Sequence, residues 1–130
     1  MHWMRIVAIV IGAGLLSSLT DWLFAGDWIH RRFTYPEVWR AGAETKAIAL
    51  TSPLPFLTSA VFVLIALQLN HPSAHANFQL AIETWLIGPL PLILTNAAFM
   101  KLHRVFVAFY ALGWLVKLLI AAAALSVFLP

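Results

Sequence analysis

The stretch VFVAFYALGWLVKLLIAAAALSVF, residues 105–128, decides the fold. It has 24 residues, of which one, Lys117, is charged. About 20 apolar residues are enough for an α-helix to cross a bilayer, whose hydrocarbon core is roughly 30 Å thick. The stretch therefore predicts a membrane-spanning helix with a lysine near its middle.

Three further stretches have the same character, so the predicted spans cover about residues 4–26, 47–69, 76–100 and 105–128. The chain has 130 residues, of which 62% are apolar and 10% charged. A soluble domain carries about 25% charged residues to cover its surface with water-compatible groups. We predict an all-α integral membrane four-helix bundle, with residues 1–130 as one domain. The first run is too long for the apolar part of a signal peptide, and we expect it to be retained as a helix.

Basic residues gather in two of the three connectors. The first and third connectors hold six of them: Arg31, Arg32, Arg40, Lys46, Lys101 and Arg104. The opposite face has Arg5 alone. Because Lys and Arg stay in the cytoplasm during insertion, both termini are predicted outside it, in a bacterial inner membrane. The net charge of +3 follows from these flanking residues, so membrane lipids are the expected partners, self-association is an open alternative, and no nucleic acid is expected.

Two proline pairs lie at different depths of the second and third spans. SPLPFLTSAVF, residues 52–62, places its pair at the start of a span, where the missing N–H donors cost little. GPLPLILTNAAF, residues 88–99, places Pro89 and Pro91 near the bilayer midplane. There the carbonyls of Trp85 and Ile87 lose their helical donors. We therefore predict that helix three is broken at Gly88–Pro91.

Lys117 needs a partner, because a lone charge in the membrane costs several kcal/mol, of order 3 on insertion scales. At 1.5 Å rise per residue, Glu83 lies roughly 8 Å nearer the outer face, within reach of a lysine side chain. We predict an intramembrane pair of Glu83 and Lys117, or contact of Lys117 with the carbonyls of Trp85 and Ile87. Both a structural pair and a functional one, such as a proton relay or a ligand counter-ion, remain open.

Small and polar residues form stripes on two of the helices. They are spaced three, four and seven apart and are predicted to face other helices: Gly14, Ser17, Ser18 and Asp21 on the first, and Gly113, Lys117, Ala121 and Ala124 on the last.

A second set of polar residues converges on the cytoplasmic end of the bundle. Asp21 and Asn96 lie at similar depth there, beside the connector 27–46, which mixes aromatic residues with acids, bases and an imidazole. The candidate catalytic residues are Asp21, His30 and Glu37; the candidate ligand-binding residues are Asp21, His30, Arg40, Asn96 and His103. Histidine is the side chain most readily poised for proton transfer near neutral pH. An interfacial belt of aromatic and basic residues explains much of the same pattern.

No metal or cofactor is expected. The chain has no cysteine. His71 and His75 are four residues apart, but Pro72 interrupts the helix that would align them, and two histidines make a poor metal site. The sequence has no glycine-rich phosphate loop and no recognisable nucleophile motif.

TDWLFAGDWIHRRFTYPEVWR, residues 20–40, and LTNAAFMKLHRVFVAFYALGWLVKLLIAAAAL, residues 94–125, resemble the small bacterial membrane proteins of the domain of unknown function 1761 type. The shared marks are chain length, four spans, an aromatic first connector and a Gly-Trp pair in the last helix. The resemblance implies a four-helix membrane domain and carries no activity or site residues.

Three classes of function remain open for a small multi-pass membrane protein. The first is binding of a lipid or small apolar ligand, or support of a membrane complex. The second is a membrane-embedded enzyme that uses acid and base groups on an apolar substrate. The third is a transporter or channel, which requires several copies because four helices fill their own interior.

Overall fold

The computed structural model describes residues 2–38, 40, 42–70 and 73–129. These residues form helices and connecting turns, with no strand among them. The helices are α1 (His2–Ala25), α2 (Asp27–Phe33), α3 (Glu44–Thr51), α4 (Leu54–Gln68), α5 (Ala74–Ile87), α6 (Pro89–Phe99) and α7 (Arg104–Phe128). The predicted all-α four-helix bundle is confirmed at this level.

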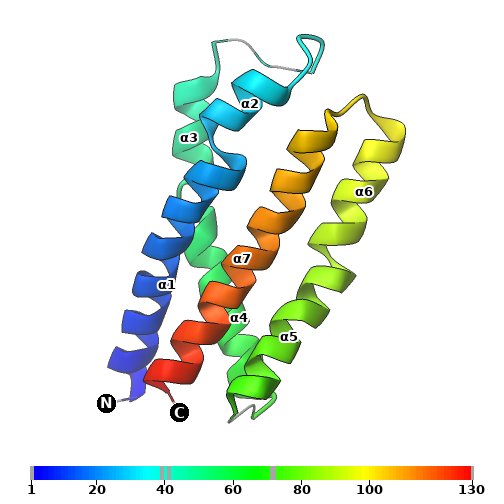
Figure 1. Cartoon of the computed structure of the whole chain (residues 1–130). Helices are drawn as coiled ribbons and strands as arrows, with labels where there is room; N and C mark the ends of the chain where they lie inside the picture. Colours follow the sequence, from blue (N-terminus) through cyan, green and yellow to red (C-terminus); the bar gives the residue numbers. More distant parts are fainter. Residues whose placement is uncertain (1, 39, 41, 71–72, 130) are drawn as a thin grey trace.

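The seven helices of the described residues form four long stretches. Each stretch runs up or down the bundle (Figure 1). All four are long and apolar enough to cross a membrane: His2–Phe33, Glu44–Gln68, Ala74–Phe99 and Arg104–Phe128. The chain ends lie together at one end of the bundle, which we call the terminus end, beside the α4–α5 connection. The opposite end, the connector end, holds α2 and the turn between α6 and α7 (Figure 1).

Gly26 separates α1 from α2 and is the extended N-cap of α2, with φ −77° and ψ 178°. A Cβ atom at this position would overlap the carbonyl oxygen of Trp22. Glycine lets the chain bend sharply enough here for α2 to turn back over the bundle. The aromatic connector thus begins with a short helix packed on α1 and α7.

The second long stretch is divided near its proline pair. Helix α3 ends at Thr51 and α4 begins at Leu54, with Pro53 as its N-cap and Pro55 in its first turn. The hydroxyls of Thr51 and Ser52 donate back to the carbonyls of Ala47 and Ile48, in competition with the helical ladder. The proline pair therefore lies at the start of a helix, as predicted. The residues before it, which were predicted to belong to the same span, form the separate short helix α3.

Helix α7 is the centre of the fold and packs against α1, α2, α4, α5 and α6. The apolar core fills the half of the bundle nearer the terminus end. It comprises Ile9 from α1, Phe62, Val63 and Ala66 from α4, Leu80 and Ala81 from α5, and Leu118, Ala121, Ala122 and Leu125 from α7. Paired alanines on α7 let its neighbours approach closely. This half of the molecule is therefore filled by side chains.

Both predicted stripes face other helices, which is confirmed. Gly14 and Ser17 are buried on α1, and Gly113, Lys117 and Ala121 are buried on α7. The Phe56 ring of α4 lies so close to Gly14 that a Cβ atom would overlap it. In the same way, a Cβ on Gly113 would lie 2.7 Å from the Cβ of Phe24. Small residues therefore set how closely α1 approaches α4 and α7.

A pocket between three helices and its polar end

A pocket of about 530 Å³ lies between α4, α6 and α7, with the end of α5 at its side. Its lining includes Thr58, Val61, Phe62 and Ile65 of α4, Thr84 of α5, Leu92, Ile93 and Asn96 of α6, and Tyr110, Trp114 and Leu118 of α7. The volume falls within the range of small-molecule sites, roughly 300–1,000 Å³. Residues Tyr110 to Leu118 extend about 12 Å along α7, at 1.5 Å rise per residue.

The pocket lies beside the interruption between α5 and α6. Helix α5 ends at Ile87 and α6 begins at Pro89, with Gly88 between them at φ −121° and ψ −85°. Below the interruption, the indole N–H of Trp85 donates to the Ala111 carbonyl at 2.8 Å and holds α5 on α7. Beyond it, the packing leaves a space between α6 and α4 that no side chain fills.

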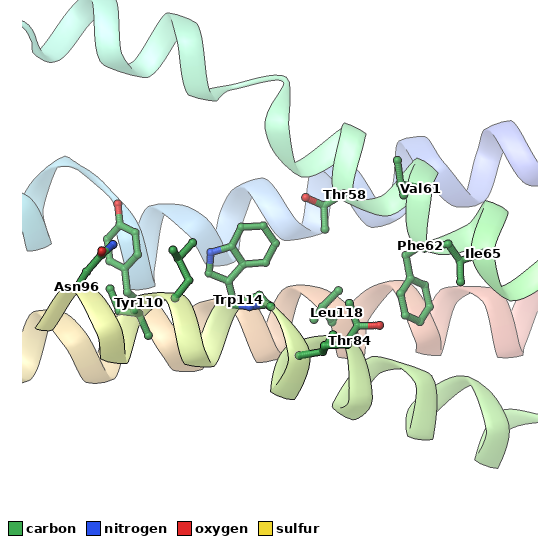
Figure 2. A pocket seen from close by; sticks show the side chains of 14 residues that line it. Thr58, Val61, Phe62, Ile65, Thr84, Asn96, Tyr110, Trp114 and Leu118 are labelled. Atoms are coloured by element: carbon green, nitrogen blue, oxygen red, sulfur yellow. The ribbon is translucent and has the colours of Figure 1, made fainter. Parts of the chain in front are cut away.

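The two ends of the pocket differ in chemistry. Figure 2 shows Asn96 and Tyr110 at one end and Val61, Phe62 and Ile65 at the other. The lining between them is apolar apart from Thr58, Thr84 and the indole N–H of Trp114. Since Val61, Ile65 and Leu92 are exposed, the pocket opens on the side of the bundle rather than at an end. A ligand would therefore enter the pocket from the side, between the helices.

Lys117 is buried, with 6% of its surface exposed, and its Nζ lies 3.0 Å from Oδ1 of Asp21. The same ammonium lies 4.2 Å from the centre of the Trp114 ring. A cation held by a carboxylate and an aromatic face is neutralised without water. This pair joins α1 to α7 and positions Trp114, which forms the pocket wall.

The prediction that Lys117 pairs with Glu83 is wrong. Glu83 is exposed and accepts a hydrogen bond from Gln79 at 2.8 Å. The inward face of α5 carries Asn77, Leu80 and Ala81, with Thr84 and Trp85 half-buried, and Glu83 lies on the other side. The helical period of the apolar residues in α5 indicates which face points inward, and Glu83 is not on that face. The prediction compared only the depths of Glu83 and Lys117 in the membrane. The alternative prediction, contact of Lys117 with the carbonyls of Trp85 and Ile87, is also wrong, because the ammonium pairs with Asp21.

Asp21 reaches Lys117 although their Cα atoms differ in predicted depth. Helices α1 and α7 are antiparallel, since both chain ends lie together (Figure 1). Because each Cα–Cβ bond tilts toward the N-terminus of its own helix, the Asp21 side chain leans toward the terminus end and that of Lys117 toward the connector end. The two side chains converge, whereas a side chain on the upward-running α5 diverges from Lys117.

His30 joins α2 to the polar end of the pocket. Its Nδ1 lies 2.9 Å from the Gly26 carbonyl, which can only accept, so Nδ1 carries a proton. In the neutral ring Nε2 is then an acceptor, and it receives the hydroxyl proton of Tyr110 across 2.9 Å. The Tyr110 oxygen keeps its lone pairs for a ligand. Tyr110 thus connects a histidine of the connector to the pocket.

Aromatic side chains hold the first part of the connector on α7. The rings of His30 and Phe106 are 5.3 Å apart, and those of Trp28 and Phe109 are 6.0 Å apart in an edge-on arrangement. Such pairs contribute about 0.5–1.5 kcal/mol beyond their buried area. Helix α2, the first part of the connector, therefore packs over the end of α7.

The other predicted site residues are divided between the pocket and the surface. Asn96 is half-buried and lines the pocket. His103 caps α7, accepting from the Val105 amide at 3.1 Å, and its ring lies tilted beside those of Phe33 and Tyr35, with ring centres 5.2 and 6.3 Å apart. Arg40 is exposed. Of the candidates, Asp21, His30 and Asn96 lie around Tyr110 and Trp114, two residues that were not predicted as site residues.

Glu37 lies outside this group. It is exposed, and its carboxylate lies 3.4 Å from Nζ of Lys101, which also sits over the Tyr35 ring at 4.6 Å. A hydrogen bond to its own backbone and the charge of Lys101 lower the pKa of Glu37 below its ordinary value. Glu37 therefore stays ionised near neutral pH and has no proton to donate there.

Within the described residues, no cluster of three or more His, Asp or Glu side chains has the arrangement of a metal site. His71 and Pro72 lie outside the described residues, so the predicted absence of a metal site at His71 and His75 stays a prediction.

Comparisons with family models, curated proteins and solved structures give no match, so the resemblance to the domain of unknown function 1761 type stays a prediction.

Breaking the Asp21–Lys117 pair should be strongly destabilising. Asp21→Ala should cost about 3 kcal/mol or more, because it leaves the buried Lys117 ammonium without its counter-charge. Lys117→Met should also destabilise the protein, but by less, because the Asp21 carboxylate that it leaves unpaired is only partly buried. The double variant should lose less than the sum of the two. Thermal unfolding of the purified protein in detergent measures these losses.

The matched control is Lys101→Met, which removes the exposed pair with Glu37 and should change stability by less than about 1 kcal/mol. Additive losses at Asp21 and Lys117, or losses no larger than that of the control, would contradict the pairing.

Proposed function

We propose that this protein is an integral membrane protein that binds a lipid or another small apolar molecule in the pocket between α4, α6 and α7. The observation that carries the proposal is a pocket of about 530 Å³ with an apolar body, one polar end and an opening on the side of the bundle. A side opening suits a ligand that arrives from the bilayer. A bundle with a purely structural role would be expected to be fully packed at the connector end, and this pocket argues against that role.

The polar end favours a head group without charge. Asn96 offers an amide, Tyr110 a hydroxyl and Trp114 an indole N–H, all neutral groups. The nearby cation, Lys117, is already paired with Asp21. A phosphate head would have to compete with that carboxylate, whereas a carbonyl or hydroxyl head needs only the neutral donors and acceptors. We therefore infer a neutral amphiphile with a hydrogen-bonding head and an aliphatic tail.

The break in the third span is part of this proposal. The α5–α6 stretch, Ala74–Phe99, would cross the membrane as one span interrupted at Gly88–Pro91. Pro89 and Pro91 cannot donate hydrogen bonds to the carbonyls of Trp85 and Ile87. Non-helical backbone at membrane depth is tolerated where it lines a cavity, and Gly88 lies in the pocket lining.

We further propose that both termini lie outside the cytoplasm of a bacterial inner membrane. The connector end carries Arg31, Arg32, Lys101 and Arg104, and basic residues are retained in the cytoplasm. The polar end of the pocket then faces the inner leaflet. A fluorescent protein that folds only in the cytoplasm, fused after residue 130, should stay dark; bright cells would contradict the orientation.

A membrane-embedded acid/base enzyme is the second candidate. The observation in its favour is the hydrogen bond between His30 and Tyr110, which places a proton donor and acceptor at the polar end of the pocket. Chemical change of a bound neutral lipid, followed by mass spectrometry and lost in Tyr110→Phe, would support it. Recovery of the lipid unchanged would exclude it for that lipid.

An oligomeric transporter or channel is the third candidate. It would need a path between copies, since the described core of one copy is filled at the terminus end.

Photolabelling tests the ligand proposal. A diacylglycerol with a diazirine in its acyl chain should label inward-facing residues of the pocket lining, such as Ile93 and Leu118, in protein reconstituted in phosphatidylcholine nanodiscs. Unlabelled diacylglycerol should compete more effectively than phosphatidic acid. Thr58→Phe, which fills the pocket, should lower labelling of the lining at least five-fold; peptide mass spectrometry locates the adducts.

The matched control is Leu57→Phe, because Leu57 is 58% exposed and lies outside the lining. Labelling spread evenly over the outer helix faces, and equal in both variants, would refute a bound ligand. Stronger competition by phosphatidic acid would refute the neutral head.

A further inference from the structure

The outer face of α5 carries polar side chains, whereas the exposed face of a membrane-spanning helix is expected to be apolar. His75, Gln79 and Glu83 are spaced four residues apart and are exposed. Residues at this spacing lie one above another along a helix. With Phe78 and Ile82 they line a hollow of about 420 Å³ on this face. The feature is separate from the pocket, which opens between other helices.

Glu83 lies too deep for water to reach in a membrane. The stretch Ala74–Phe99 has 26 residues, about 39 Å of helix, and the hydrocarbon core is roughly 30 Å thick. Glu83 follows Ala74 by nine residues, or about 14 Å, which places it well inside the core. Acidic side chains at such depth almost always face protein or a water-filled cavity. A neighbouring protein surface would satisfy this condition for the exposed face of α5.

We propose that α5 packs against α5 of a second copy of this chain, around a two-fold axis that passes near Gln79. The proposal requires that α5 lie in a membrane, but it does not require that the pocket bind a ligand.

The Gln79 amide suits a second copy because it is self-complementary. One N–H of Nε2 is given to Oε1 of Glu83. An amide has a second N–H and a carbonyl oxygen, and neither has a partner among the described residues. Across a two-fold axis each Gln79 can donate to the other's carbonyl, so the same patch serves both copies. The Glu83 side chains lie one turn further along the same axis, and each accepts a hydrogen bond from its own Gln79.

Apolar side chains beside the stripe complete the interface. Phe78, Ile82 and Leu86 are 36%, 46% and 51% exposed and flank the polar residues. Association of membrane helices relies on such packing together with hydrogen bonds across the contact. None of these three residues belongs to the apolar core of the chain, so association of two copies through them would leave the fold of each copy unchanged.

Cysteine cross-linking tests the pairing directly, because the chain has no cysteine of its own. Ile82→Cys, in native membranes oxidised with copper phenanthroline, should run mostly at twice the monomer mass on non-reducing gels. Ile11→Cys is the control: it is 49% exposed on α1 and lies at a similar distance from the terminus end. It should remain monomeric.

In the Ile82→Cys background, Gln79→Leu should lower cross-linking at least three-fold, while Gln68→Leu, at the end of α4, should leave it unchanged. Equal cross-linking of Ile82→Cys and Ile11→Cys overturns the proposal. So does cross-linking of Ile82→Cys to a different protein, or indifference to Gln79→Leu. Photolabelling of the pocket is independent of all these outcomes, so the two proposals can fail separately.

Discussion

The ion pair between Asp21 and Lys117 is the constraint on which the rest of the structure depends. A lysine at the middle of an apolar helix needs a partner, and the carboxylate of α1 supplies it at 3.0 Å. This contact fixes the end of α1 on α7, and α2 follows directly from that end after Gly26. His30 is thereby placed on Tyr110, and the ammonium holds Trp114 in position. One buried charge thus organises the connector end, while apolar packing organises the terminus end.

The pocket follows from a second local constraint. Below Gly88, the hydrogen bond from Trp85 and the packing of Leu80 and Ala81 keep α5 on α7. Above it, prolines start a new helix, and the space beside α4 stays open. Neutral polar groups gather at the connector end of this space, since the nearest cation already has its counter-charge. This combination of shape and chemistry supports the proposed neutral amphiphile over an anionic one.

Much of the fold was predictable from the sequence, because length, apolar runs and small-residue stripes are local properties of the chain. The burial of Lys117 and the candidates Asp21, His30 and Asn96 also followed from such patterns. The partner of Lys117 did not, since the prediction compared depths and ignored which face of α5 carries Glu83 and which way each side chain leans. Tyr110 and Trp114 were missed because aromatic residues in an apolar run give no signal of their own. The pocket depends on packing between helices far apart in sequence, which no local pattern records.

Exchange of the two charges measures the central interaction most directly. The variants Asp21→Lys and Lys117→Asp each place two like charges at the contact, and each should fail to give folded, monodisperse protein in detergent. The double exchange restores opposite charges, and since the two side chains lean toward each other, a long and a short partner can trade places. We predict that thermal unfolding of the double variant recovers most of the original stability. A double variant no more stable than the single ones, or single variants as stable as the original chain, would contradict this account.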